Sequence, residues 1–159
     1  MIRIGQSTDI HKLVENEELI LGGVKIEYHK GLQGHSDADV LVHAICEAII
    51  GALALNDLGS LFPDNDPKYK GISSLILLED VYKKMCEMQF SVGNIDSLII
   101  IEKPKLRGYI EKMRENIARV LHCDLSKINI KATTSEKLGF VGREEGVIAQ
   151  AVCLIESVE

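Results

Sequence analysis

Hydrophobic and polar positions alternate along the chain with a period that changes from segment to segment. Runs rich in β-branched residues predict strands at 2–5, 95–101, 128–133 and 147–155. The first strand leads into a polar segment at 6–11. Two further β-rich runs, 18–22 and 24–28, meet at Gly22 and Gly23 and predict a hairpin.

Apolar residues at helical spacing predict three helices, at about 36–55, 74–88 and 105–121. Ser36 or Asp37 would cap the first helix, and its apolar face is formed by Val40, Ala44, Ala48 and Gly51. Alternating strands and helices predict an α/β layer structure, in which helices pack against a sheet.

Composition narrows the class of protein. The chain has 159 residues, 46% of them hydrophobic, which predicts one globular domain with a sizeable core. Its net charge of −6 and its 4% aromatic content argue against a protein that coats nucleic acid. The most apolar stretch, 48–55, falls short of the about 20 residues that span a bilayer. Early polar residues argue against a signal peptide, so we expect a cytoplasmic protein.

Cysteine usage points to the same compartment. Cys46, Cys86, Cys123 and Cys153 form no C-x-x-C pair, which disfavours a zinc ribbon or a disulfide framework. We expect reduced and mostly buried thiols.

Asp9 and His11 form the first candidate site. On an extended segment their side chains point to the same side, and His43 in the following helix could join them. Two imidazoles and a carboxylate suit a tetrahedral Zn²⁺ with one open position. A surface Asp-His pair beside an unrelated helical histidine is the simpler alternative.

His35 to Asp39 form the second candidate. Free N–H groups at a helix start attract anions, and His35 and Ser36 could add donors to a phosphate. The same residues could serve only to cap the helix. Asp39 lies four residues before His43 and could orient its ring.

Residues 61–71 contain two prolines, two aspartates and two lysines, so they cannot form a helix interior. They could be a polar flap over a substrate or a solvated turn.

Residues 131–146 form the fourth candidate. Thr133, Thr134 and Ser135 end a predicted strand and precede Glu136, an arrangement that suits phosphate oxygens and a divalent cation. Thr133 to Glu136 also fit a helix capping box.

Taken together, these motifs resemble one family. D-I-H at 9–11, G-L-Q-G-H-S-D-A-D-V-L-V-H at 31–43, N-D-L-G-S-L-F-P-D-N-D at 56–66 and K-A-T-T-S-E-K-L-G-F-V-G-R-E-E-G at 131–146 closely resemble the 2-C-methyl-D-erythritol 2,4-cyclodiphosphate synthases of the non-mevalonate isoprenoid pathway. The resemblance implies a single domain over 1–159 of α/β (α+β) type. It also implies a mixed β-sheet with helices on one face, a small N-terminal hairpin, and a homotrimer whose sheets line the threefold axis and whose active sites lie between adjacent subunits.

The resemblance also implies roles for residues. Asp9, His11 and His43 would bind Zn²⁺, and Glu136 would hold a second ion, Mg²⁺ or Mn²⁺. His35 and Thr134 would stabilise the transition state. The implied substrate contacts are Asp9, Ile10, His11, His35, Ser36, Asp57, Leu58, Gly59, Phe62, Pro63, Asp64, Asn65, Asp66, Ile101, Glu102, Lys103, Pro104, Lys105, Leu106, Arg107, Thr133, Thr134, Ser135, Glu136, Phe140 and Arg143.

The implied reaction is intramolecular. The 2-phosphate of 4-diphosphocytidyl-2-C-methyl-D-erythritol 2-phosphate attacks the β-phosphorus, CMP leaves, and a cyclic diphosphate forms. No protein nucleophile is needed, and the sequence shows no convincing Ser-His-Asp or Cys-His arrangement. Two rivals are a metal-dependent phosphohydrolase and a non-catalytic trimer that senses isoprenoid diphosphates.

Four positions depart from the usual pattern of the family, two of them by small changes: Ala38 replaces a usual glycine and Ser135 a usual threonine. Relatives usually carry a glycine and an aromatic residue where this chain has Ser7 and Thr8. Phe140, Arg143 and Glu145 would flank a cavity on the threefold axis that holds isoprenoid diphosphates in some relatives. Replacing an aromatic residue by Thr8 should alter the lining of that cavity.

Overall fold

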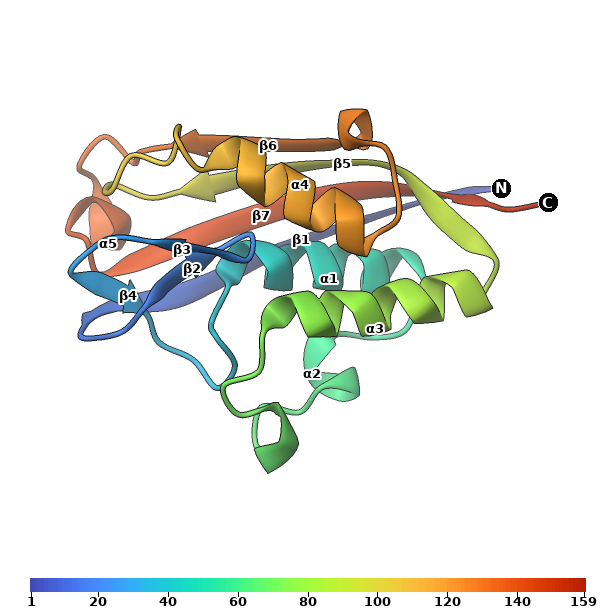
Figure 1. The fold of residues 1–159 in the computed structure, drawn as a ribbon, viewed down its shortest axis with the longest axis horizontal. Coiled ribbons are helices and arrows are strands. Elements are labelled where there is room, and N and C mark those ends of the chain that lie inside the picture. Colours follow the sequence, from blue (N-terminus) through green and yellow to red (C-terminus); the bar gives the residue numbers. More distant parts are fainter.

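A five-stranded sheet forms the centre of the computed structural model, which describes residues 1–159 (Figure 1). The strand order is β4-β1-β7-β5-β6. Only β5 and β6 run parallel, so the sheet is mixed, as expected. The strands are β1 (Ile2–Glu15), β4 (Lys30–Leu32), β5 (Phe90–Ile100), β6 (Ile128–Thr133) and β7 (Gly146–Ser157).

Strand β1 is much longer than the predicted 2–5. The polar residues of 6–11 belong to it, because each one pairs with β7, from Gln6 opposite Val152 to His11 opposite Val147. One side of β1 faces the helices and the other does not, so polar side chains are tolerated at alternate positions. Strand β5 likewise begins at Phe90, before the predicted start at 95, because its first residues pair with the end of β7.

Three long helices cover one face of the sheet (Figure 1): α1 (Val40–Ala52), α3 (Ser74–Glu87) and α4 (Ile110–Val120). Helix α3 matches its prediction closely. Helix α4 begins five residues later than predicted, because 101–109 form turns instead.

Helix α1 corrects two predictions. Its cap is Asp39, whose Oδ1 accepts a hydrogen bond from Val42 N at 3.1 Å, and not Ser36 or Asp37. The helix also has no single apolar face, because it lies between the sheet and α3 and almost every residue is buried. Gly51, predicted to lie on that face, is exposed.

The predicted hairpin is present as β2 (Leu19–Leu21) and β3 (Val24–Ile26). Gly22 and Gly23 have positive φ angles of 57° and 73°, which favour glycine. The fully buried Asp39 carboxylate accepts hydrogen bonds from both of their N–H groups, at 3.0 and 2.7 Å. This carboxylate therefore joins the hairpin to the start of α1.

Four short helical segments complete the chain and were not predicted: α2 (Leu58–Leu61), η1 (Pro67–Tyr69), η2 (Leu125–Lys127) and α5 (Gly139–Gly142). None of the helices is both long and apolar enough to cross a membrane. All four cysteines are free; Cys46 and Cys153 are buried, Cys123 is half-buried and Cys86 is exposed.

The buried hydrophobic residues form one core cluster between the sheet and its helices. The opposite face of the sheet carries no helix (Figure 1) and exposes apolar side chains, among them Ile4 at 69% and Val152 at 50%. An exposed row of this kind favours a protein partner.

Candidate metal centre and substrate cavities

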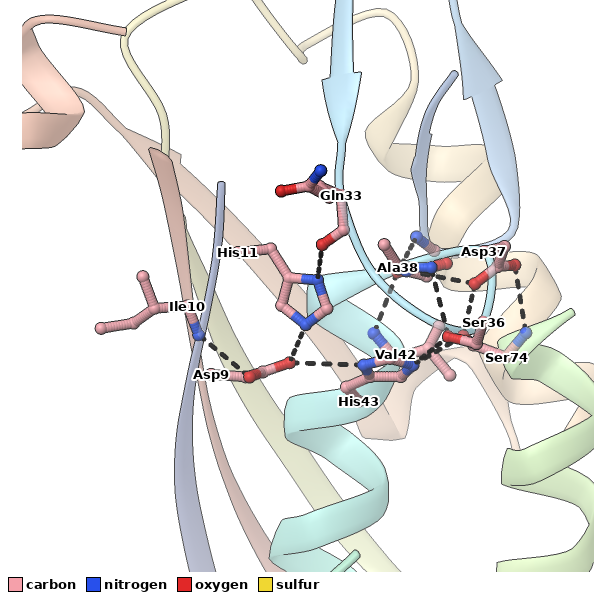
Figure 2. A network of polar contacts seen from close by, with 12 residues as sticks. Asp9, Ile10, His11, Gln33, Ser36, Asp37, Ala38, Val42, His43 and Ser74 are labelled. Carbon is pink, nitrogen blue, oxygen red and sulfur yellow. Dashed lines mark hydrogen bonds and ion pairs between the residues drawn. The ribbon is translucent and has the colours of Figure 1, made fainter. Parts of the chain in front are cut away.

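Asp9, His11 and His43 come together as predicted. Asp9 and His11 are two residues apart on β1, and His43 reaches them from the first turns of α1 (Figure 2). Asp9 Oδ2 lies 3.0 Å from His11 Nε2 and 3.4 Å from His43 Nδ1. One ligand atom from each residue lies within 4.8 Å of the others, so all three can reach one metal ion.

In each histidine, the ring nitrogen that does not face Asp9, which we call the outer nitrogen, contacts another group. His11 Nδ1 lies 3.1 Å from the Gln33 carbonyl oxygen, which can only accept, so Nδ1 carries a proton. His43 Nε2 lies 2.9 Å from Ser74 Oγ, whose own proton is donated to Asp37 (Figure 2). In the neutral rings, the lone pairs of His11 Nε2 and His43 Nδ1 are therefore directed toward Asp9.

The charge of the site suits a cation. Burial opposes ionisation of Asp9, but contacts with the two imidazoles hold the pKa of its carboxyl well below the usual range. Burial lowers the pKa of His11, but its contact with Asp9 outweighs this and the net pKa is raised. Asp9 Oδ2 is buried and has no conventional hydrogen-bond donor. Two nitrogen ligands and one carboxylate oxygen without a hydrogen-bond partner fit a zinc ion with an open fourth position.

A cavity of about 420 Å³, the metal cavity, opens beside this triad. Nine of the predicted substrate contacts line it: His11, His35, Ser36, Leu58, Gly59, Phe62, Pro63, Asp64 and Asn65. His43 also lines it. The structure therefore brings two residues of the triad, the turn at His35 and Ser36, and the predicted flap to one cavity.

Two hydrogen bonds connect the predicted flap to His35, at Asp66 and at Gly71. His35 Nε2 donates to the Asp66 carbonyl at 2.8 Å, and Gly71 N donates back to the His35 carbonyl at 2.7 Å. Asp66 itself caps η1 through Lys68 N. These two bonds join the ring and the backbone of His35 to the predicted flap.

Asp57 lies beside the metal cavity without lining it. Its Oδ1 caps the unpredicted helix α2 by accepting from Ser60 N at 2.9 Å and Ser60 Oγ at 2.7 Å. Leu58 and Gly59, which follow it, do line the cavity. Ile10 is exposed and its side chain is not among the cavity residues.

A second cavity, of about 510 Å³, lies across the sheet; we call it the loop cavity. Its walls are the turns after β5 and the end of β6. Predicted contacts that line it are Ile101, Glu102, Pro104, Lys105, Leu106, Arg107, Thr133 and Thr134. Glu102 Oε2 accepts from Ser135 N at 3.3 Å, which ties the two walls together.

The remaining predicted residues line neither cavity. Lys103, Ser135 and Glu136 belong to the turns around the loop cavity, and Glu136 N donates to Thr134 Oγ1 at 3.2 Å. Phe140 lies on α5, and Arg143 Nε pairs with Glu145 at 3.1 Å. The structure does not bring Glu136 to the triad of Asp9, His11 and His43 within one chain, because β7 and β5 separate β1 from β6.

A family model described as the YgbB family matches residues 2–156. The chain belongs to the YgbB family. Curated relatives match the chain over nearly their whole length. A 2-C-methyl-D-erythritol 2,4-cyclodiphosphate synthase from Finegoldia magna is 60% identical over 97% of each chain, and one from Clostridium acetobutylicum is 58% identical over 97% of this chain and 99% of the relative.

Solved structures agree with this YgbB fold. The bifunctional IspDF from Campylobacter jejuni has a TM-score of 0.96 and 42% identity; it covers all of this chain, which spans only 43% of that protein's length. A CDP complex of IspF from Plasmodium falciparum has a TM-score of 0.87 and 37% identity, over 99% of this chain and 97% of the other.

Sequence reasoning missed two groups that hold the triad of this YgbB chain. The Ser74 hydroxyl and the Gln33 carbonyl each bond the outer nitrogen of one histidine. A main-chain carbonyl leaves no trace in side-chain identity. Ser74 reads as part of a helix start, and only the packing of α3 on α1 reveals its contact with His43.

Proposed function

We propose that this chain is a 2-C-methyl-D-erythritol 2,4-cyclodiphosphate synthase. It would convert 4-diphosphocytidyl-2-C-methyl-D-erythritol 2-phosphate into the cyclic diphosphate with release of CMP. The observation that carries the proposal is the convergence of three metal-ligand residues, of which His11 and His43 line a cavity that the predicted flap also lines. The names of its relatives at up to 60% identity support the same reaction.

Asp9, His11 and His43 would hold zinc, because their free lone pairs and single negative charge match its preferred ligands. When bound, zinc supplies Lewis-acid polarisation of a phosphate oxygen. The histidines contribute by staying unprotonated at the nitrogens that face Asp9, which the contacts of their outer nitrogens favour.

His35 and Thr134 would stabilise charge as the new bond forms. His35 donates from Nε2 to the flap carbonyl, so Nδ1 is its remaining polar atom, and the ring can donate from it to a phosphate oxygen only when both nitrogens are protonated. Thr134 Oγ1 accepts from Glu136 N, which leaves its hydroxyl proton for donation. Fixed donors of this kind favour the transition state when they are positioned in advance.

The reaction balances without a protein nucleophile. An oxygen of the 2-phosphate forms a bond to the β-phosphorus, the bond from that phosphorus to the bridging oxygen breaks, and CMP departs with the bridging oxygen. Catalysis of this type depends mainly on positioning and charge neutralisation.

The loop cavity would hold the cytidine and its phosphates. Lys105 and Arg107 supply positive charge there, and Thr133 and Thr134 supply hydroxyls. Glu136, in the adjoining turn, would hold Mg²⁺ or Mn²⁺ on the diphosphate. The CDP complex of the Plasmodium falciparum relative supports a nucleotide in this fold.

A homotrimer would complete each active site. The metal cavity and the loop cavity share no lining residue and lie on different strands of the sheet, so one chain offers two halves of a site. The exposed apolar face of the sheet offers a surface by which copies can associate around a threefold axis. The metal half of one copy would then meet the loop half of the next.

Three further expectations stay predictions: a single domain over 1–159, a cytoplasmic location and an isoprenoid diphosphate in the axial cavity. Ser7 is buried on the helix side of β1 and Thr8 is exposed. Only Thr8 is therefore available to line that cavity with Phe140 and Arg143.

The deciding experiment uses purified protein, the diphosphocytidyl substrate and Mg²⁺, before and after zinc is stripped, with products identified by mass spectrometry. CMP and the cyclic diphosphate, lost on stripping and restored by zinc, would support the proposal. CMP with an uncyclised phosphate would favour a phosphohydrolase. A zinc-loaded trimer with no turnover would favour the sensor.

A further inference from the structure

The structure assigns Ser74 and Asp37 as positioning residues that set which nitrogen of His43 is offered to the metal. This inference rests on the proposed function, because it concerns the zinc site of that reaction. Neither residue lines the metal cavity, so neither is placed to touch substrate. Both act through His43.

The contact between Ser74 and His43 has a defined direction. Ser74 is fully buried, and its hydroxyl donates to Asp37 Oδ1. With its only proton committed, Ser74 Oγ can interact with His43 Nε2, 2.9 Å away, only as an acceptor. His43 Nε2 therefore carries the ring proton, and Nδ1 is left with its lone pair toward Asp9.

Asp37 is what commits the Ser74 proton. Its Oδ1 also accepts from Asp39 N at 3.1 Å, and its Oδ2 accepts from Ser74 N at 3.1 Å. The carboxylate therefore faces three donors from two segments of the chain (Figure 2). Without this acceptor the Ser74 hydroxyl would be free to donate to His43 Nε2, and the tautomer with its proton on Nδ1 would be stabilised instead.

Ser36 does not perform the same task, although its Oγ also lies 3.0 Å from His43 Nε2. Ser36 Oγ accepts from Ala38 N, and its own proton is not committed to a carboxylate. It also lines the metal cavity, where its hydroxyl can donate a hydrogen bond to a substrate phosphate. Ser74 is thus the acceptor that remains in place when substrate binds.

The test measures zinc affinity by competition with a chromogenic chelator, beside the thermal midpoint of the zinc-free protein. Ser74→Ala should weaken zinc binding by about 10- to 100-fold. Asp37→Asn keeps the volume of the side chain but replaces one acceptor oxygen by an NH₂ group that faces the N–H and O–H donors of Asp39 and Ser74. It should weaken zinc binding by about tenfold. Ser73→Ala is the matched control, because Ser73 is exposed, precedes the same helix and makes no side-chain cap.

Ser74→Ala and Asp37→Asn proteins that fold and bind zinc as tightly as wild type would overturn the inference. If the His43→Ala protein binds zinc as tightly as wild type, the proposed function is overturned, and this inference with it.

A second measurement needs no variant at Ser74. In zinc-loaded wild-type protein, the His43 Nε2–H should give a slowly exchanging ring resonance in a ¹H–¹⁵N spectrum, because Ser74 Oγ accepts it in a buried position. The resonance should persist in Ser36→Ala. Its absence from the wild-type spectrum would contradict the assignment even if Ser74→Ala fails to fold.

Discussion

The two cavities differ in how much of their chemistry is fixed within one chain. In the metal cavity, both histidines and the flap are held by hydrogen bonds to groups of the same chain, and the one between Ser74 and His43 is buried. Around the loop cavity, Thr133, Thr134 and Glu136 are exposed, and the side-chain contact that ties the walls, from Ser135 N to Glu102, is longer at 3.3 Å. A metal site requires fixed ligands, whereas a nucleotide can help to order the loops around it.

The largest effect should come from His43→Ala. Removing this ligand should abolish zinc binding and lower turnover about 1,000-fold or more, since metal polarisation contributes several kcal/mol to the barrier. The proposed trimer should survive, because little core volume is lost. His29→Ala is the control, since His29 is exposed, pairs with Glu15 and does not belong to the triad. Zinc content and steady-state kinetics measure both, and a fully active His43→Ala protein without zinc would refute the site.

Thr134→Ala tests the loop cavity by the same two measurements, steady-state kinetics and zinc binding. If its hydroxyl acts mainly on the transition state, kcat should fall about 100-fold with little change in KM. Zinc affinity should be unaffected, in contrast to His43→Ala. Thr134→Ser keeps the hydroxyl and should retain most of the activity. An unchanged kcat with a raised KM would place Thr134 in ground-state binding only.

Mixing the two inactive variants tests whether the two halves come from different copies. In mixed trimers, a Thr134→Ala chain offers an intact metal half and a His43→Ala chain an intact loop half. Equal, random mixing by co-refolding should restore about one quarter of wild-type activity, since a competent pair arises at about one interface in four. Activity no greater than the sum of the separate variants would show that each site lies within one chain.

The smallest effect is a pH dependence. As pH falls, the stability of the zinc-free protein should rise, whereas its affinity for zinc should fall. In the zinc-free protein the raised pKa of His11 stabilises the fold fully below its ordinary value of 6.5, and this stabilisation is lost as pH rises through the folded pKa. The urea midpoint should therefore rise between about pH 8 and pH 6. Zinc affinity should fall over the same range, because protons compete for His11. His11→Asn should remove the first trend.

Sequence patterns predicted most elements, and failed where tertiary contacts override local preference. The polar residues 6–11 form a strand because β7 supplies every partner, which no local period reveals. Helix α1 starts at Val40 because the buried Asp39, and not Ser36 or Asp37, accepts the free N–H. For the site, residues two apart on a strand correctly predicted the Asp9 and His11 pair. The contacts of Ser74 and Gln33 depend on packing between distant segments and could not be foreseen.

The Asp39 carboxylate has a consequence for local unfolding. It holds three amides at once, those of Gly22, Gly23 and Val42, so the hairpin cannot detach without also freeing the first turn of α1. These amides should therefore exchange with deuterium as one cooperative unit. His43 belongs to that turn, so zinc should slow exchange in the hairpin as well, although no hairpin residue is a ligand. Zinc binding at the triad would thus be detectable as slower deuterium exchange at the Gly22 and Gly23 amides.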